Sequence, residues 1–168
     1  MACYPRPVRS LTPVEAAVAV AIAGSVLAAA VPPFVRNLHA SRLVEPLDGL
    51  NRIATRATAL AAGNTAEAAY PESVGLTPAE VPQGEEVLDP PGTWDHATWV
   101  KLDFRFEVPH AYSFAFESHN QPGRALFRAQ AHGDLDGDGI HSSFSISGES
   151  RDGSEPVVYP MDIHREVE

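Results

Sequence analysis

The distribution of apolar and charged residues divides the chain into an N-terminal apolar run and a mixed remainder. Twenty consecutive residues, 16–35, carry no charged side chain, and about 20 apolar residues are needed for a helix to cross the hydrocarbon core of a bilayer. Glu15 lies at the edge of this run, and a carboxylate in lipid costs several kcal/mol unless a positive charge pairs with it. The pattern therefore predicts a membrane-spanning helix over residues 11–35, with a partner charge for Glu15 that comes from outside the run.

A helical pattern continues beyond the apolar run. Apolar residues recur at three- and four-residue spacing, as they do on one buried helix face. These residues are Leu43, Leu47, Leu50, Ala54, Ala57 and Ala61. The spacing predicts an amphipathic helix over residues 36–62 that continues the span and stops at Gly63-Asn64. Pro32, Pro33 and Pro46 are expected to bend or loosen this long helix rather than end it, because the pattern holds on both sides of them.

The remainder of the chain predicts a small sheet. Residues 63–93 are rich in Pro, Gly and Glu, which indicates a linker without a regular core element, and a short helix is expected at residues 94–102. Aromatic and small residues then alternate in three runs, which predicts strands separated by turns at 120–123 and 134–139. The alternating residues are Tyr112, Phe114 and Phe116, then Phe127, Ala129 and Ala131, then Phe144 and Ile146. The predicted fold class is α+β, a long N-terminal helix packed on a small antiparallel β-sheet.

Charge is divided unevenly along the chain, whose net charge is −10. Residues 1–62 hold six basic and three acidic side chains, a net charge of +3, whereas residues 63–168 hold six and nineteen, a net charge of −13. An acidic domain repels the phosphate backbone, so nucleic acid is not an expected partner. The only cysteine, Cys3, precedes the apolar run, so the chain has no second cysteine with which to form an internal disulfide.

The N-terminal residues also carry a motif. A short basic leader, residues 1–10, precedes Leu11, and Glu15 is the fifth residue counted from Leu11. Gly24 and Pro32 lie within the apolar run at positions that loosen a helix. Together these positions resemble the N-terminus of type IV prepilins and of the related pseudopilins of type II secretion.

The resemblance implies processing and assembly. A prepilin peptidase would cut between Ser10 and Leu11, the new N-terminal residue would be methylated, and Glu15 would take the place of the family's assembly glutamate. Two departures are visible: Ser10 stands where the family usually has Gly, and Leu11 stands where it usually has Phe or Met. They favour a minor or divergent subunit.

The resemblance also implies a division of the chain. Residues 1–10 would be the leader, 11–35 the transmembrane and assembly helix, and 36–62 its amphipathic continuation. Residues 63–168 would form an acidic exported α+β head. The implied partners are a prepilin peptidase, other pilin subunits and the inner membrane.

Two other interpretations of the apolar run stay open. A cleaved secretory signal would have a shorter apolar region followed by a small-x-small site. Ala28–Ala30 could supply that site, but Glu15 within the apolar region argues against it. A plain N-terminal anchor would also tether a soluble domain.

An acidic loop is the second candidate site. Asp134, Asp136 and Asp138 alternate and are followed by glycine, like the first half of an EF-hand calcium loop, in which Ile140 would supply a backbone carbonyl. The twelfth position is Ser145 rather than a bidentate Glu. The alternative is an Asp-Gly hairpin turn with solvated acids, so calcium is the one cofactor that the sequence suggests.

No enzyme is expected. The sequence contains no nucleophile elbow, zincin motif, phosphate loop or dinucleotide fingerprint. The seven histidines show no metal-ligand spacing; His132 and His141 flank the acidic loop and are interpreted as exposed surface residues. Trp94 and Trp99 are expected to be core anchors.

Two function classes therefore remain. In the first, the chain is a structural subunit of a type IV pilus or pseudopilus. In the second, it is a membrane-anchored exported binding domain, calcium-dependent through the acidic loop, that does not polymerise.

Overall fold

The computed structural model describes residues 12–164, with the side chains of residues 32–42 excepted. The chain divides into two compact units, with the boundary in sequence between Leu38 and His39. The first unit holds most of helix α1 (Pro13–Arg42), and the second holds an α+β domain.

Helix α1 begins with a local cap and exposes its apolar residues. Thr12 precedes the helix, and Pro13 occupies the first helical position, where its missing N–H costs no hydrogen bond. Residues Pro13–Val31 are long and apolar enough to cross a membrane, and none of that stretch is buried within the chain. A signal sequence meets the same criteria of length and composition. The predicted N-terminal apolar helix is confirmed.

The single long helix predicted for residues 11–62 is not confirmed. Helix α1 ends at Arg42, and helix α2 (Val44–Ala62) begins after Leu43. Pro46 explains the break, because it has no N–H to donate to the carbonyl of Arg42 and must lie in the first turn of a new helix. The stop at Gly63 is as predicted; its N–H donates to the Leu60 carbonyl at 3.2 Å.

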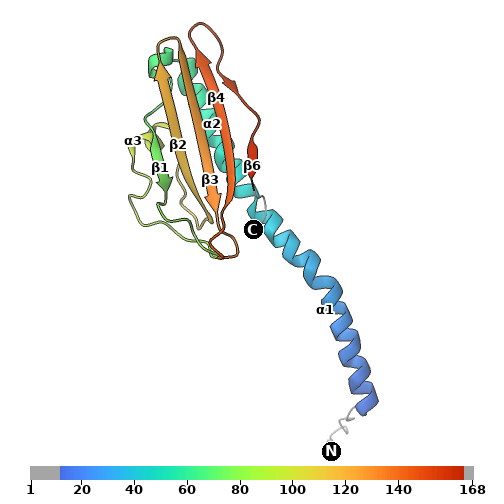
Figure 1. The fold of residues 1–168 in the computed structure, drawn as a ribbon. Helices are drawn as coiled ribbons and strands as arrows, with labels where there is room; N and C mark the ends of the chain where they lie inside the picture. The colour runs from blue at the N-terminus through green and yellow to red at the C-terminus, as the bar shows by residue number, and fades with distance from the viewer. Residues whose placement is uncertain (1–11, 165–168) are drawn as a thin grey trace, which may run out of the picture. The chain divides into compact units, whose positions relative to one another are not determined.

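The second unit is built on an antiparallel sheet in the order β1-β2-β3-β4-β5, and β6 also pairs with β4 (Figure 1). The strands are β1 (Val74–Thr77), β2 (Tyr112–Gln121), β3 (Arg124–Gly133), β4 (Ser142–Arg151), β5 (Val157–Val158) and β6 (Asp162–His164). The three long strands β2, β3 and β4 confirm the predicted alternation. The turn between β2 and β3 is Pro122-Gly123, where φ of Gly123 is +78°, a conformation that favours glycine.

Several shorter elements differ from the sequence prediction. Residues 63–93 are not a linker without core elements: they contain a 3₁₀ turn, η1 (Ala66–Ala68), and strand β1. Tyr70 of this stretch is buried, with its ring edge-on to Phe127 at 5.0 Å between centroids. Helix α3 (Ala97–Lys101) is shorter than the predicted 94–102, and its cap is His96, whose Nδ1 accepts the Thr98 N–H at 3.2 Å.

The core lies between α2 and the sheet. In Figure 1, α2 lies across one face of the sheet, behind β3 and β4. Four of the residues predicted from the spacing are buried in α2, namely Leu50, Ala54, Ala57 and Ala61, and Ile53 joins them. Leu43 and Leu47 are only half-buried against the core. Trp94 and Trp99 are core residues as expected, and their rings pack at 5.5 Å between centroids. Helix and sheet approach closely at Gly49, where a Cβ would lie 2.6 Å from the Phe114 ring.

Candidate functional site

Glu15 has a hydrogen-bond partner in Thr12, the residue immediately before its own helix. Its Oε2 accepts the Thr12 N–H at 2.8 Å and the Thr12 hydroxyl at 2.9 Å, while the Glu15 N–H donates to the Thr12 Oγ1 at 3.3 Å. This reciprocal arrangement is a capping box, which satisfies free N–H groups at the start of a helix. The sequence carries the signature of this motif, Thr12-Pro13-Val14-Glu15, but the capping box was not predicted.

The other predicted processing and assembly residues are placed only in part. Ser10 and Leu11 lie outside the described residues. Gly24 lies in the exposed part of α1, and a Cβ built on it would meet nothing within 4 Å. The backbone of Pro32 is helical, so the proline pair does not end α1.

The acidic loop joins β3 to β4 and is organised around Asp134. This residue is 1% exposed, and its two carboxylate oxygens accept the N–H groups of Gly137 and Gly139 at 2.8 and 3.0 Å. Its carbonyl accepts the Gly84 N–H at 2.7 Å. Asp134 therefore holds the turn together and ties it to the segment that follows β1.

Asp136 and Asp138 are exposed and close to Asp134. Asp136 accepts the Asp138 N–H at 3.2 Å, and Asp138 accepts the N–H of Ile140 at 2.7 Å. One oxygen from each of the three carboxylates lies within 4.8 Å of the others. The loop thus gathers three acids as the calcium interpretation requires, although each also has a role in the plain turn.

The histidines beside this loop differ from each other. His141 is exposed as expected, but His132 is half-buried, and its Nδ1 lies 2.9 Å from the hydroxyl of Ser143. Burial lowers the pKa of His132, and the nearby His141 and Arg128 lower it further. The expectation that His132 is a surface residue was wrong.

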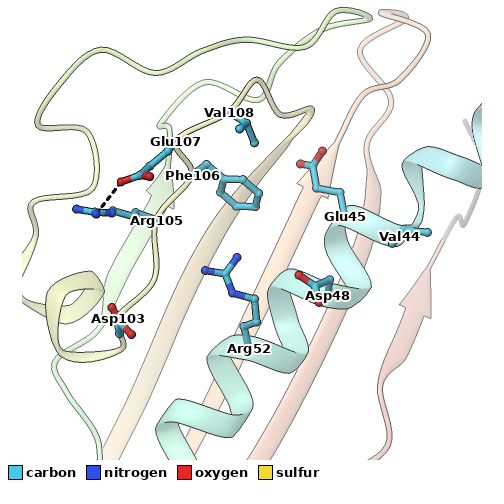
Figure 2. A pocket seen from close by; sticks show the side chains of 9 residues that line it. All are labelled: Val44, Glu45, Asp48, Arg52, Asp103, Arg105, Phe106, Glu107 and Val108. Carbon is cyan, nitrogen blue, oxygen red and sulfur yellow. Dashed lines mark ion pairs between the residues drawn. The ribbon is translucent and has the colours of Figure 1, made fainter.

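A groove at the start of α2 was not predicted (Figure 2). Glu45 and Asp48 line it from α2, and the segment 103–108 lines it from the other side. The carboxylate of Glu45 accepts the N–H of Ala111 at 3.1 Å and the N–H of Tyr112 at 3.0 Å, so it caps the start of β2. Burial raises the pKa of Glu45, and these hydrogen bonds oppose that rise.

The remaining charges of the groove are mostly paired across short distances. Arg105 and Glu107 form an ion pair at 2.6 Å, visible in Figure 2, and Arg52 lies over the Phe104 ring with 5.2 Å between its guanidinium carbon and the ring centroid. Asp103 pairs with Arg56. Four acidic and two basic side chains line the groove, so its surface is net negative, and two of those acids, Asp103 and Glu107, are paired with arginines.

Glu149 on β4 forms a second cluster that the sequence did not reveal. It accepts hydrogen bonds from Arg124 at 3.0 Å, from the Tyr159 hydroxyl at 2.9 Å, and from Arg151. These hydrogen bonds, that from Arg124 first, lower the pKa of Glu149 to about 2. The cluster ties the segment after β5 to the central strands.

Comparison of the chain with protein-family models, with curated proteins and with solved structures finds no match. The candidate sites are thus defined by this chain's own residues. They are the exposed apolar helix with Glu15 and the loop that carries Asp134, Asp136 and Asp138.

Proposed function

We propose that the chain is a structural subunit, minor or divergent, of a type IV pilus or pseudopilus. The observation that carries this proposal is the apolar stretch Pro13–Val31, none of which is buried among the residues that the structure describes. Exposed apolar surface of this extent requires a bilayer or other protein chains to cover it. In the proposed function, the inner membrane surrounds this apolar stretch before assembly. After assembly, the same helix of neighbouring subunits covers it.

The second unit is consistent with this role. Its helix α2 packs on an antiparallel sheet and follows α1 after one residue, Leu43. The head is acidic, which favours solubility outside the cell. In the proposed subunit a prepilin peptidase cuts between Ser10 and Leu11, and Gly24 and Pro32 let the assembly helix loosen locally during packing.

Thiol cross-linking along α1 tests polymerisation. Val18 and Leu27 are exposed and nine residues apart, which places them on opposite faces of a helix with about 100° per residue. In a background in which Cys3 is replaced by serine, the double variant Val18→Cys/Leu27→Cys should give a ladder of cross-linked multimers in the native cell. The single variant Leu27→Cys, the matched control, should stop at dimers. Monomers alone from the double variant would contradict assembly through this helix.

The alternative function is a membrane-anchored exported binding domain that does not polymerise. Two observations favour a binding domain over a domain that is merely anchored and binds nothing. The capping box gives Glu15 a local role without a partner subunit, and the acidic loop gathers three carboxylate oxygens at a spacing that one cation can span.

Calcium dependence of the fold tests the second observation. A loop without the twelfth-position Glu should bind calcium with a Kd of about 0.1–1 mM. About 10 mM calcium would then stabilise the folded chain by about 1.4–2.7 kcal/mol through mass action. The full chain in detergent should melt at a higher temperature in calcium than in chelator.

Two variants sharpen this measurement. Asp136→Asn keeps the oxygen that accepts the Asp138 N–H but removes the charge, so it should remove the calcium effect. Glu117→Gln, at an exposed position on β2, should keep that effect. An equal melting temperature for the parent chain with and without calcium would support the plain-turn interpretation.

A further inference from the structure

A short C-terminal segment covers the edge of β4. Residues 155–164, named here the edge strap, pair with β4 in two pieces: β5 pairs at residues 148–149, and β6 pairs at residues 143–145. The Tyr159 N–H also donates to the Ser147 carbonyl at 2.8 Å. Pro160, which has no N–H to donate, lies between the two pieces. Few backbone hydrogen bonds therefore hold the edge strap on β4.

The edge strap also buries little apolar surface. Val157, Val158, Tyr159 and Ile163 are each 39–54% exposed, whereas Met161 is partly buried and packs against the core. Burial of apolar surface is the dominant favourable contribution to folding. Local opening of the edge strap should therefore cost less free energy than unfolding of the whole domain.

The turn that leads into the edge strap is fixed to the rest of the domain. The Asp152 Oδ1 accepts the Ala66 N–H at 2.8 Å, which ties the turn to η1. The Ser154 N–H donates to the Arg151 carbonyl at 3.1 Å and closes the turn. An opening edge strap would consequently hinge after this turn.

One side chain of the edge strap forms a hydrogen bond to a buried carboxylate. The Tyr159 hydroxyl donates to the Glu149 Oε2 at 2.9 Å, and Glu149 is 6% exposed. Since the hydrogen bonds of Glu149 hold its pKa at about 2, the acceptor is a carboxylate at neutral pH. A hydrogen bond to an ionised acceptor is roughly twice as strong as one between neutral groups.

The other donors to Glu149 belong to the sheet and not to the edge strap. Arg124 of β3 donates to both carboxylate oxygens at 3.0 and 3.2 Å, and Arg151 of β4 donates as well. The two arginines lie directly opposite each other in the β3–β4 register, so the carboxylate offsets their mutual repulsion. They hold Glu149 in place with the edge strap closed or open. Tyr159 is therefore the donor that leaves when the edge strap opens.

We propose that the edge strap opens from β4 as a unit, and that the hydrogen bond between Tyr159 and Glu149 is its latch. While it is closed, the edge strap occupies backbone groups of β4 that an uncovered edge would offer to a strand of another chain. Opening exposes those groups. This inference is independent of whether the chain polymerises, because all of these contacts lie within the second unit.

Amide hydrogen exchange of the full chain in detergent at neutral pH tests the latch. In Tyr159→Phe, the protection factor of the amide at residue 159 should fall at least about tenfold, as expected for the loss of one hydrogen bond to a charged group. The protected amides of β6 should fall by the same factor, and the amide of Ala129, in the centre of β3, should keep its protection. Constant protection at residue 159, a fall there without one in β6, or an equal fall at Ala129 would overturn the proposal.

Two further variants test the part played by the charge of Glu149. Glu149→Gln keeps an oxygen for the Tyr159 hydroxyl but removes the charge, so in that background Tyr159→Phe should lower protection less than about fivefold. Glu155→Gln, at an exposed acid of the edge strap, is the matched control and should exchange like the parent.

An equal effect of Tyr159→Phe in both backgrounds would overturn the proposal. A loss of protection in Glu155→Gln as large as that in Tyr159→Phe would also overturn it. Where Glu149→Gln does not fold, the comparison of Tyr159→Phe with the parent decides the matter, because Tyr159 is exposed enough to be replaced without loss of the fold.

Discussion

Replacement of Glu15 by alanine should leave membrane insertion and cleavage intact but largely abolish incorporation into filaments. In the proposed subunit, cleavage would place the new amine four residues before Glu15 in sequence, about one turn of a helix. A carboxylate that pairs with the amine of a neighbouring subunit offsets the cost of two charges in an apolar bundle and fixes the axial register. Removal of one partner of such a buried pair costs about 3–5 kcal/mol, which corresponds to association weaker by more than about a hundredfold.

The capping box makes a sharper version of this experiment available. Glutamine can replace glutamate at the third position of a capping box, so Glu15→Gln keeps the bond to Thr12 and removes the charge. Thr12→Ala keeps the charge and the backbone N–H that donates to Glu15, and removes the two hydrogen bonds of the Thr12 hydroxyl. The filament proposal expects Glu15→Gln to fail like Glu15→Ala, and Thr12→Ala to assemble. If Glu15→Gln assembled normally, the role of Glu15 would be to cap α1 and nothing more.

Replacement of Gly148 by alanine should be strongly destabilising. Gly148 of β4 lies opposite Phe127 of β3, and a Cβ there would lie 2.4 Å from the Phe127 ring and 2.7 Å from the Val157 carbonyl oxygen. The Val157 carbonyl oxygen belongs to the backbone of β5, which pairs with β4 at this point. A backbone atom cannot rotate away like a side chain, so the edge strand of the sheet would have to move to relieve the clash. Overpacking of this kind costs about 1–3 kcal/mol.

Gly75→Ala is the matched control for this effect. Gly75 is also a strand glycine, in β1, but a Cβ there would meet nothing within 4 Å. The free energy of unfolding of Gly75→Ala should stay within about 0.5 kcal/mol of that of the parent chain. Denaturant unfolding of the full chain in detergent, followed by tryptophan fluorescence, measures both variants. Equal stability of the two would contradict the close β3–β4–β5 packing described above.

The parts of the fold that the sequence predicted are those whose signal is local. Alternation of apolar residues within 112–116, 127–131 and 144–146 identified β2, β3 and β4, and uninterrupted apolar composition identified α1. The strands β1, β5 and β6 are two to four residues long, too short for a periodic signal, and they exist because a long neighbour supplies their hydrogen bonds. The break at Leu43 was missed because the apolar spacing continues through it, whereas the missing N–H of Pro46 interrupts only the backbone.

The candidate sites follow the same rule. The three aspartates of the acidic loop are neighbours in sequence and were found, and the capping box at Thr12 could have been found from its spacing. Glu45 and Glu149 were not identifiable, because their partners lie far along the chain: Ala111 for Glu45 and Arg124 for Glu149.

The mass of the intact native protein tests the filament proposal most directly. Processing at the predicted site removes residues 1–10 and adds one methyl group to the new N-terminus, so the proposal expects the mass of residues 11–168 plus that methyl group. Cys3 would be lost with the leader, and the mature protein would contain no thiol. A chain that keeps its leader, or one that begins after Ala30 as a cleaved secretory signal would leave it, would contradict assembly through α1.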